Sequence, residues 1–382
     1  MPTRASTNLF YQRSSRIVVS MAPMVYYSEP PRLISNIGKH LERCCVSLEE
    51  ADAVAVKLHM GEEGNARYIR PNIVRAVVDW LKERGVEPFV TDSTTLYRRR
   101  RHTLFDYLRT AAAHGFTSES LGCPVLIADG IKSTGVAVEV ESPVKLRKVP
   151  VSGLIYEADA LVCLSHVTLH PDVLPAGSLK NVAMGCTTKE AKMRMHASDA
   201  KPIFDVEKCV GCGTCVRHCP AGALELRNGK VFFTPERCVS CAECIAFCSF
   251  GAVKVNWDAL SKDVCRGVVD AAKAVLSTFA HGKAAFLNLG YDITAECDCG
   301  GDSRLPVVTD FGLLSSQDPV AVDRASVDMV NTQPAYPGGE FSKLSESPDR
   351  MSSYKPSVNW AEFLSLASDA GLGETTYELV KI

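Results

Sequence analysis

The sequence predicts an α/β fold with a mostly parallel sheet, into which a small α+β module is inserted. Short apolar segments typical of buried strands alternate with amphipathic helical segments, and this alternation is characteristic of parallel sheets. It stops where cysteines gather, over residues 203–257, and resumes afterwards. The simplest architecture is one α/β domain built from residues 1–202 and 258–382 around an inserted module of residues 203–257. Separate domains in tandem are the alternative.

The first half of the chain supplies most of the predicted sheet. The predicted strands are Arg16–Tyr27, Ala51–His59, Pro88–Asp92, Val125–Asp129 and Ala158–His166. Between them, Pro71–Arg84 has helical periodicity and begins with a proline, which is tolerated in the first turn of a helix. A second helical pattern covers Thr103–His114.

After the module the same pattern returns. Residues 258–280 and Pro319–Val330 are predicted helices, and Ala284–Leu289 and Pro306–Asp310 are predicted strands. A loop rich in proline, glycine and serine follows over residues 332–357, and a last helix is predicted near Ala361–Ala370.

Composition excludes several classes of protein. The 382 residues include 42 basic and 44 acidic side chains, so no basic excess favours nucleic-acid binding. No apolar run is long enough to span a membrane, and we expect a cytoplasmic protein. Residues 1–28 lack acids and contain three arginines. They are interpreted as a short polar arm before the first strand, with an organellar targeting segment as the alternative.

The cysteine-rich segment contains an internal repeat with an offset of 29 residues. Residues 209–226 read CVGCGTCVRHCPAGALEL and residues 238–255 read CVSCAECIAFCSFGAVKV; seven of the 18 aligned positions are identical, including all four cysteines. Each half has the spacing C-x-x-C-x-x-C-x-x-x-C of bacterial ferredoxins, in which the fourth cysteine ligates the other cluster. The segment is therefore predicted to be a ferredoxin-like module with two 4Fe–4S clusters.

The ligands of the two clusters follow from this crossing. One cluster is assigned to Cys209, Cys212, Cys215 and Cys248, and the other to Cys238, Cys241, Cys244 and Cys219. Pro220 follows Cys219 as the pattern expects, whereas Ser249 stands at the matching position of the second half, which removes a rigid residue but no ligand. Between the halves, Arg227-Asn228-Gly229 is typical of a hairpin turn.

Two alternatives to redox clusters were weighed. Zinc sites usually combine pairs of cysteines or cysteine with histidine, and not duplicated runs of four. Purely structural clusters would hardly need to be two side by side, so electron transfer is favoured. Exposed clusters of low potential also indicate an anaerobic or oxygen-protected setting.

Polar residues end several predicted strands, where ligands of α/β sheets bind. They are His59, Asp92, Asp129, His166 and Asp310. A single aspartate at such a position often only caps a turn, so the prediction of a site rests on their convergence. Lys57 and His59 also precede a glycine-bracketed acidic loop, GEEG.

A further group of chemically capable residues follows the predicted strand Ala158–His166. Residues 178–186, SLKNVAMGC, contain Lys180, Asn181 and Cys186, and His196 comes ten residues later. Lysine can hold an anionic group and histidine can transfer a proton; a solvated helix with a buried cysteine is the alternative. The predicted catalytic residues are Lys57, His59, Asp129, Lys180, Asn181 and His196.

Cys297-Asp298-Cys299 is a second candidate metal site. Two glycines follow it, and an extended backbone would point both sulfurs into one small volume. A third metal or a redox thiol pair is one interpretation, and packing thiols are the other. Arg98–Arg101 is interpreted as a solvated loop face, with a phosphate or an acidic partner as its alternative ligand. No nucleotide-binding glycine motif is present.

Together these segments resemble a known family. KLHMGEEGNARYIRP (57–71), FVTDSTTLY (89–97), VLIADG (125–130), SLKNVAMGC (178–186), ECDC (296–299) and LLSSQDPVAVDRAS (313–326), with the module, are similar to the iron–sulfur-centre proteins of domain-of-unknown-function family 362. The resemblance covers residues 51–330 and implies an α/β domain joined to a two-cluster ferredoxin module, mostly in anaerobic prokaryotes. It also implies one shared site, formed by Lys57, His59, Lys180, Asn181, Cys186, His196, Cys297 and Cys299.

The leading hypothesis is a ferredoxin-coupled oxidoreductase. Electrons would pass through the two clusters to a substrate or metal in the α/β domain. The expected partners are a redox protein, either a ferredoxin or a reductase, and a small-molecule substrate. The alternatives are an electron carrier or adaptor without its own substrate, and a non-redox α/β enzyme or metallocentre maturation factor.

Overall fold

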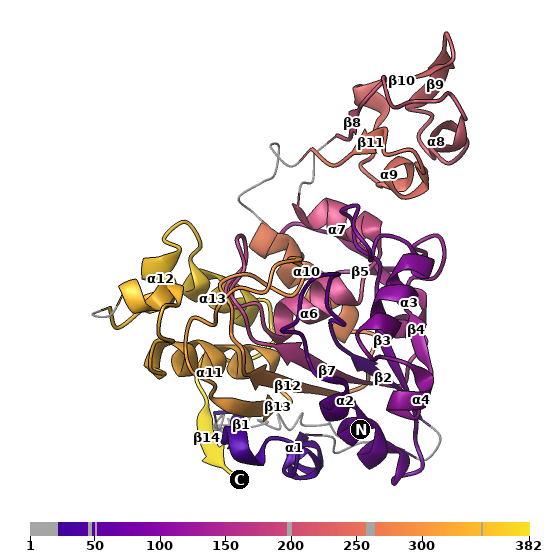
Figure 1. Cartoon of the computed structure of the whole chain (residues 1–382). Coiled ribbons are helices and arrows are strands. Elements are labelled where there is room, and N and C mark those ends of the chain that lie inside the picture. Colours follow the sequence, from indigo (N-terminus) through magenta and orange to yellow (C-terminus); the bar gives the residue numbers. More distant parts are fainter. Residues whose placement is uncertain (1–21, 45–47, 50–51, 197–200, 257–263, 345–346) are drawn as a thin grey trace, which may run out of the picture.

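The computed structural model describes residues 22–44, 48–49, 52–196, 201–256, 264–344 and 347–382. Its centre is an eight-stranded sheet with the order β14-β1-β13-β12-β7-β2-β3-β4 (Figure 1). The strands are β1 (Met24–Ser28), β2 (Ala53–Lys57), β3 (Glu87–Asp92), β4 (Val125–Ile127), β7 (Ala160–His166), β12 (Ala284–Gly290), β13 (Gly312–Ser316) and β14 (Glu378–Lys381). A separate hairpin pairs β5 (Gly135–Glu139) with β6 (Lys148–Ser152).

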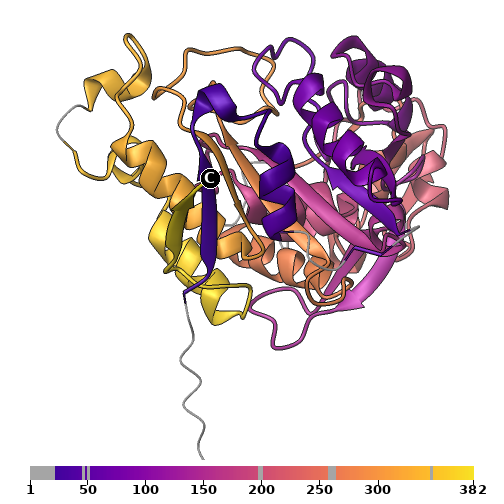
Figure 2. The ribbon, with the colours of Figure 1, turned by 90° about the horizontal axis from the view of Figure 1, so that it is seen from below.

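Most strand pairs of this sheet are parallel, which confirms the predicted α/β class. β12, β7, β2, β3 and β4 pair in parallel in that order. β13 is antiparallel to both β12 and β1. β14 then pairs in parallel with β1, so the C-terminal strand lies beside the first described strand (Figure 2). The five parallel strands place their carboxyl ends at one common edge.

Helices cover both faces of the sheet. The main helices are α1 (Ile37–Cys44), α2 (Pro71–Lys82), α3 (Leu104–Ala113), α6 (Ser178–Gly185), α7 (Lys189–His196), α10 (Val264–Leu276), α11 (Pro319–Thr332) and α13 (Trp360–Asp369). Shorter helices are α4 (Ser118–Leu121), α5 (Gly153–Tyr156), α12 (Arg350–Tyr354) and the 3₁₀ turns η1 (Pro30–Arg32) and η4 (Glu340–Lys343). None of the described helices is long and apolar enough to cross a membrane.

The alternation of side chains along β2 explains the two cores. Val54 and Val56 pack with α1, α2 and α3, whereas Ala55 packs on the opposite face with α6, α10 and α11. Successive residues of a strand point to opposite faces, so an apolar strand buried on both sides needs helices on both sides. Lys57 continues the Ala55 face and therefore points toward α6.

Most predicted elements are confirmed, with two corrections. The segment predicted as a loop over residues 332–357 contains the short helices η4 and α12. Pro306–Asp310 is not a strand: Pro306 and Val308 form isolated bridges only, and the strand begins at Gly312. Proline cannot donate a ladder hydrogen bond, and here the segment is a crossing loop paired with Thr294 and Ala335. Residues 16–21 of the predicted strand Arg16–Tyr27 and residues 258–263 of the predicted helix lie outside the described residues.

The cysteine-rich segment forms small elements of its own. They are β8 (Ile203–Phe204), α8 (Thr214–Arg217), β9 (Leu224–Arg227), β10 (Lys230–Phe233), η2 (Pro235–Arg237), α9 (Glu243–Phe247) and β11 (Val253–Lys254). β9 and β10 form the predicted hairpin, with Asn228 and Gly229 at positive φ in its turn. Positive φ at both central residues is the type I′ geometry that asparagine and glycine favour.

The sequence repeat is also a repeat of backbone conformation. Gly211 and Ser240 have φ values of 69° and 54°, and Gly213 and Ala242 have 67° and 62°; the members of each pair are 29 residues apart. Helices α8 and α9 begin at Thr214 and Glu243, which have the same offset. The two halves therefore fold in the same way, even though the second half has serine and alanine at the two positions where the first half has glycine.

The module packs against the α/β domain beyond α7 (Figure 1). Leu96 and Met193 from the α/β domain are buried in the same apolar cluster as Ile245 and Val253 of the module. Arg98 donates a hydrogen bond to the backbone carbonyl of Cys248. These contacts bring the loop after β3 directly beneath the module.

Candidate functional site

The eight cysteines of the repeat line two separate cavities. One is lined by Cys209, Cys212, Cys215 and Cys248, and the other by Cys219, Cys238, Cys241 and Cys244. In each cavity three cysteines come from one half of the repeat and the fourth comes from the other half. This is the grouping expected from the spacing, and all eight thiols are free of disulfides.

Backbone N–H groups point at several of these sulfurs. Val231 N–H lies 3.3 Å from Cys209 Sγ, Ala223 N–H 3.3 Å from Cys219 Sγ, and Ser240 N–H 3.5 Å from Cys238 Sγ. Burial, followed by the neighbouring cysteines, raises the pKa of Cys215. Four thiolates in such a place therefore need positive charge close by, which metal ligation supplies.

A cleft of about 760 Å³ separates the module from the α/β domain. Ile245, Gly251 and Val253 line it on the module side, and Cys297 and Cys299 line it on the other. The module therefore opens onto the second cysteine motif of the chain.

Beyond Cys299 lies a smaller pocket of about 200 Å³ at the carboxyl ends of the parallel strands. Its polar lining comes from segments far apart in sequence. The charged and polar residues are Lys57, His59, Asp92, Ser93, Thr95, Tyr97, Arg101, His170, Asp172, Lys180, Asn181, Lys192 and His196. Ligands of α/β domains collect at this edge, and of the five predicted strand-end residues His59 and Asp92 line the pocket, whereas Asp129, His166 and Asp310 do not.

Lys57 crosses beneath α6 and is held on both sides. Its Nζ donates to Asn181 Oδ1 at 2.6 Å and lies 3.0 Å from Asp92 Oδ1, with 1% of its side chain exposed. Asn181 is itself fixed, because its amide nitrogen donates to the carbonyl of Leu164 at 2.8 Å. A side chain at Gly185 would place its Cβ 2.1 Å from the Lys57 amine, so any larger residue here would displace the lysine from its position between Asn181 and Asp92.

Arg101 is the second buried cation of the pocket. Its guanidinium lies 3.2 Å from the Glu62 carboxylate and 3.9 Å from Asp92, and only 2% of its side chain is exposed. Arg98, Arg99 and Arg100 are exposed. The interpretation of this run as a solvated loop face is therefore wrong for Arg101, whose ion pairs compensate its burial.

Two lysines line the pocket without a carboxylate partner. Lys192 Nζ donates to Ser93 Oγ at 2.7 Å and to the carbonyls of Thr94 at 2.7 Å and Thr187 at 2.9 Å. Lys180 has no hydrogen bond or ion pair with any described residue. Burial lowers the pKa of both lysines to about 8, because the charged form is costly away from water.

Three histidines line the pocket, and two of them accept a backbone hydrogen bond at Nδ1. Gly61 N–H donates to His59 Nδ1 at 3.0 Å, and Asp172 N–H donates to His170 Nδ1 at 3.1 Å. Burial, together with nearby cations, lowers the pKa of both rings well below the ordinary histidine value. A neutral ring whose Nδ1 accepts a hydrogen bond carries its proton on Nε2. Both histidines are therefore Nε2–H donors.

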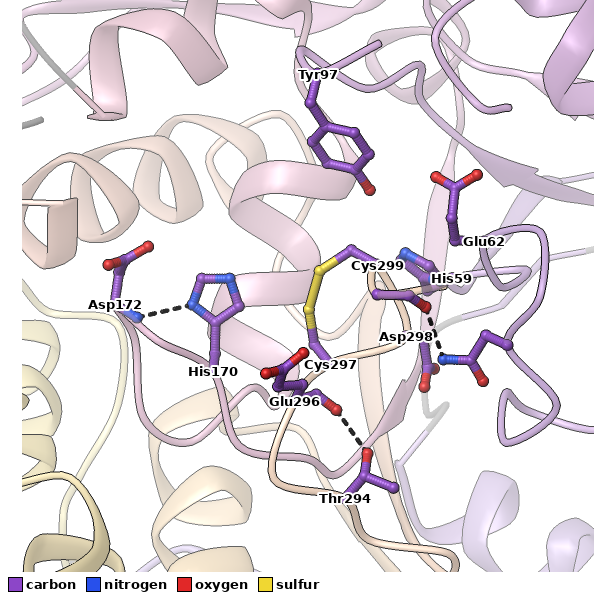
Figure 3. Close-up of a disulfide and its surroundings, with 12 residues drawn as sticks. His59, Glu62, Tyr97, His170, Asp172, Thr294, Glu296, Cys297, Asp298 and Cys299 are labelled. Carbon is purple, nitrogen blue, oxygen red and sulfur yellow. Dashed lines mark hydrogen bonds between the residues drawn. A yellow bond between two sulfur atoms is a disulfide. The ribbon is translucent and has the colours of Figure 1, made fainter. Parts of the chain in front are cut away.

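The Cys297–Cys299 loop is held in place from three directions, of which Figure 3 shows the hydrogen bond between Thr294 and Glu296. Glu62 N–H donates to the carbonyl of Asp298 at 3.1 Å, and Thr294 Oγ1 donates to the carbonyl of Glu296 at 2.6 Å. His166 bonds the Asp298 carboxylate through Nδ1 at 2.8 Å and the carbonyl of Tyr291 through Nε2 at 2.7 Å. Both partner oxygens accept hydrogen bonds, so both ring nitrogens of His166 donate. Burial lowers the pKa of His166, but Asp298 outweighs burial and the pKa is raised overall. An imidazolium thus anchors the loop.

Cys297 and Cys299 form a disulfide in this structure. One ligand atom each of His170, Cys297 and Cys299 lie within 4.8 Å of one another. Cys297 is 8% exposed, and Cys299 lines both the cleft and the smaller pocket. The two sulfurs therefore occupy the junction between the module and the cation-lined pocket.

The structure brings most of the predicted site residues together. Lys57, His59, Lys180, Asn181, His196 and Cys299 all line the smaller pocket. Cys186 is fully buried near Lys57 and is not among the lining residues. Asp129 is not among them either: its carboxylate accepts from Thr94 N–H at 2.8 Å and from Ser133. It supports the loop after β3 and does not face the pocket.

Several pocket residues had no role in the sequence-based prediction. Lys192 looks like one of many lysines on a polar helix, and His170 follows an apolar segment without a recognisable motif. Asp92 differs from these two, because the sequence predicts it as one of the converging strand ends. For Asp92 that signal was sufficient in principle, whereas the burial of Lys192 depends on the packing of α7 against the loop after β3.

Comparison with known proteins gives local and global similarities. A stretch of 28 residues is 57% identical to Ferredoxin-2 from Desulfomicrobium norvegicum, covering 7% of this chain and 48% of that protein. The lactate racemase apoprotein from Thermoanaerobacterium thermosaccharolyticum is similar over 73% of this chain and 52% of its own, with 13% identity and a TM-score of 0.35. A Thermotoga maritima protein is similar over 69% and 51%, with 12% identity and a TM-score of 0.33.

The chain thus spans about half the length of each of these relatives. The family described as "Domain of unknown function (DUF362)" matches residues 54–328, which include the sheet edge, the module and the Cys297–Cys299 loop. This chain belongs to that family.

Proposed function

We propose that the protein is an iron–sulfur redox protein that carries electrons into its α/β domain. The two groups of four cysteines would hold two 4Fe–4S clusters, and the acceptor would be the Cys297–Cys299 pair. The observation that carries the proposal is the position of Cys299, which lines both the module-facing cleft and the cation-lined pocket. A redox pair at this junction is accessible from both sides.

The residues of the module fit such clusters. Each cavity gathers four free thiols, and backbone N–H groups point at the sulfurs of Cys209, Cys219 and Cys238. Thiolate ligation with hydrogen bonds to the sulfurs is typical of iron–sulfur proteins, and bound clusters supply electrons one at a time. The local similarity to a ferredoxin supports the same assignment.

The chemistry assigned to Cys297 and Cys299 is the reduction of their disulfide. Two electrons and two protons cleave the S–S bond and give two thiols. His170 can assist, because the hydrogen bond from Asp172 to Nδ1 leaves the proton on Nε2, and this nitrogen faces the disulfide (Figure 3). A neutral Nε2–H can donate a hydrogen bond that stabilises the thiolate formed when the disulfide opens, and the two protons come from water in the open cleft.

A metal held by His170, Cys297 and Cys299 is the second candidate, because the three side chains are close enough to share one ion. The hydrogen bond to His170 Nδ1 disfavours it. Metal binding through Nε2 would require that nitrogen to lose its proton while Nδ1 accepts from the Asp172 backbone. The redox pair needs no such change.

The test uses full-length protein purified without oxygen. Iron analysis should give about eight irons per chain. A reduced bacterial ferredoxin is then added, and free thiols are alkylated and located by mass spectrometry. We expect Cys297 and Cys299 to become alkylated together, with two electrons consumed per disulfide in addition to those that remain on the clusters. A Cys241→Ser variant should lose one cluster and slow this reduction at least about tenfold, whereas Cys123→Ser, a buried cysteine outside both groups, should not.

Three results would overturn the proposal. These are two or fewer irons per chain with stoichiometric zinc in the module, a Cys297–Cys299 disulfide that stays intact while the clusters are reduced, and equal reduction with and without clusters. A stoichiometric metal other than iron that is lost in a Cys297→Ser, Cys299→Ser variant would favour the second candidate.

A further inference from the structure

We propose that the pocket behind Cys299 binds a small oxyanion, a molecule bearing a carboxylate or phosphate group, through Lys180, Lys192 and His59. That this anion is the substrate of the protein rests on the proposed function. That the anion binds depends only on the residues of the pocket. The pocket has a volume of about 200 Å³, which corresponds to roughly seven water molecules at their liquid volume. Only a small molecule fits.

The charges around the pocket do not balance. Four basic side chains line it, and the two acids of the lining are Asp92 and Asp172. Asp92 and the nearby Glu62 are already paired with Lys57 and Arg101, at N···O distances of 3.0–3.9 Å. Their negative charge is therefore largely used in compensating these two cations. Asp298 and Asp129 lie near Lys180 and Lys192 and favour their charged forms, but neither carboxylate forms an ion pair with them in the described part of the chain, so these two lysines are the least compensated cations of the pocket.

Lys192 and Lys180 supply this positive charge in different ways. All three N–H donors of Lys192 bond to neutral oxygens, those of Ser93, Thr94 and Thr187. These bonds fix the amine without neutralising its charge. Lys180 Nζ has neither a hydrogen bond nor an ion pair with the described part of the chain, so its donors remain available to a ligand in the pocket.

Burying an ammonium without a counter-ion costs free energy, and proteins normally pair such groups. The lowered pKa of Lys180, about 8, reflects this cost. A bound anion would offset it for both lysines at once. A neutral ligand would leave the cost unchanged, so the pocket discriminates by charge.

His59 provides the third contact. Its Nδ1 accepts from Gly61 N–H at 3.0 Å, and its Nε2 is buried without a hydrogen-bond partner among the described residues. Buried polar atoms are rarely left unsatisfied. An Nε2–H that faces the same pocket as Lys180 can donate to an oxygen of the anion. The ligand would then lie beside Cys299, which lines the same pocket.

The test is calorimetric titration of the iron-loaded, full-length protein under argon, with malonate, inorganic phosphate and the uncharged acetamide as probes. We expect malonate or phosphate to bind with one site per chain and acetamide not to bind. Whichever of the two anions binds more tightly identifies the acidic group of the ligand. Lys180→Met keeps the length of the side chain and removes its charge, and should weaken binding at least about tenfold.

Lys189→Met is the matched control. Lys189 is also buried, burial also lowers its pKa to about 8, and its Nζ bonds to the carbonyl of His102 outside the pocket. This variant should bind the anion like the wild type, and the visible absorption of the clusters reports whether each variant is folded.

A second measurement needs no variant. Acetylation of lysines in the wild-type protein, located by mass spectrometry, should label Lys180 less when the anion is present. Absence of binding by both anions, equal binding of acetamide, or equal loss in both lysine variants would overturn the inference. Anion binding without electron transfer to Cys297–Cys299 would instead refute the proposed function alone.

Discussion

At the scale of single residues, His40 shows how burial sets a titration. It lies in α1 with no exposed surface, and its ring bonds Ser315 Oγ at 2.7 Å and Ser28 Oγ at 2.9 Å. Burial lowers its pKa from 6.5 to about 4. The folded protein therefore keeps this ring neutral at pH values where the unfolded chain protonates it.

The sign of the pH dependence follows directly. Below pH 6.5 the unfolded state binds a proton that the folded state does not, so stability falls as the pH decreases. From pH 6.5 to pH 5 the loss is about 1.6 kcal/mol, because the slope increases from half a proton at pH 6.5 toward one proton, or about 1.4 kcal/mol per pH unit. We expect a His40→Gln variant to show a slope of unfolding free energy against pH that is shallower by up to one proton over this range.

Urea unfolding under argon at pH 5.0 to 7.5 measures this slope. The other buried histidines and the module are common to both proteins, so the difference between the two slopes isolates His40. Parallel slopes would mean that the ring is already protonated, or already hydrated, in the folded protein.

At the scale of elements, the repeat allows a reciprocal test of the module. Gly213 and Ala242 precede α8 and α9 at matching positions with φ values of 67° and 62°. A left-handed conformation costs a residue with a Cβ roughly 1–2 kcal/mol, part of which glycine returns as entropy in the unfolded chain. Gly213→Ala should destabilise the module by about 1 kcal/mol or less, and Ala242→Gly should stabilise it by a similar amount.

The rate at which the visible absorption of the clusters disappears in the presence of an iron chelator measures both effects. We expect faster loss for Gly213→Ala and slower loss for Ala242→Gly than for the wild type. A Cβ at Gly213 would approach the ends of the Arg217 and Leu226 side chains at 3.3 and 3.4 Å, which is tight, so these flexible ends must shift slightly to accommodate it. If both substitutions changed the rate of cluster loss in the same direction, side-chain packing rather than backbone conformation would determine the stability of these turns.

The elements also show what sequence patterns can predict. Buried strands such as β2 and β7 are continuous apolar runs followed by helices, and both were predicted with boundary errors of a few residues. Pro306–Asp310 was wrongly predicted as a strand, because an apolar run does not reveal whether a partner strand is within hydrogen-bonding reach. The next residues, Gly312–Ser316, have that partner in β12.

The residues of the pocket also fall into two groups, those that sequence patterns predict and those that they do not. Lys57 and His59 were predicted because they follow a strand whose carboxyl end must lie at the ligand-binding edge. Arg101 and Lys192 were not, since their burial depends on Glu62, Asp92 and Ser93 from other segments. A short sequence pattern shows that a residue lies at the end of a strand, whereas only the tertiary structure shows that distant segments bury it.

At the scale of the whole molecule, each half of the module contributes one cysteine to the cavity of the other half, which links the two halves. Cys219 lies with Cys238, Cys241 and Cys244, and Cys248 lies with Cys209, Cys212 and Cys215. Cys248 also accepts, through its carbonyl, the hydrogen bond from Arg98 of the α/β domain. A cluster in the first cavity would therefore be linked to the second half of the module and to the loop beneath it.

This arrangement predicts how single substitutions alter the clusters. Cys219→Ser, although it lies in the first half of the repeat, should change the paramagnetic resonance spectrum of the reduced protein in the same way as Cys241→Ser. Cys248→Ser should instead match Cys212→Ser. The reason is that loss of one ligand perturbs the cluster it holds and leaves the other cluster with all four thiolates. If Cys219→Ser matched Cys212→Ser, each half would hold its own cluster and the crossing would be wrong.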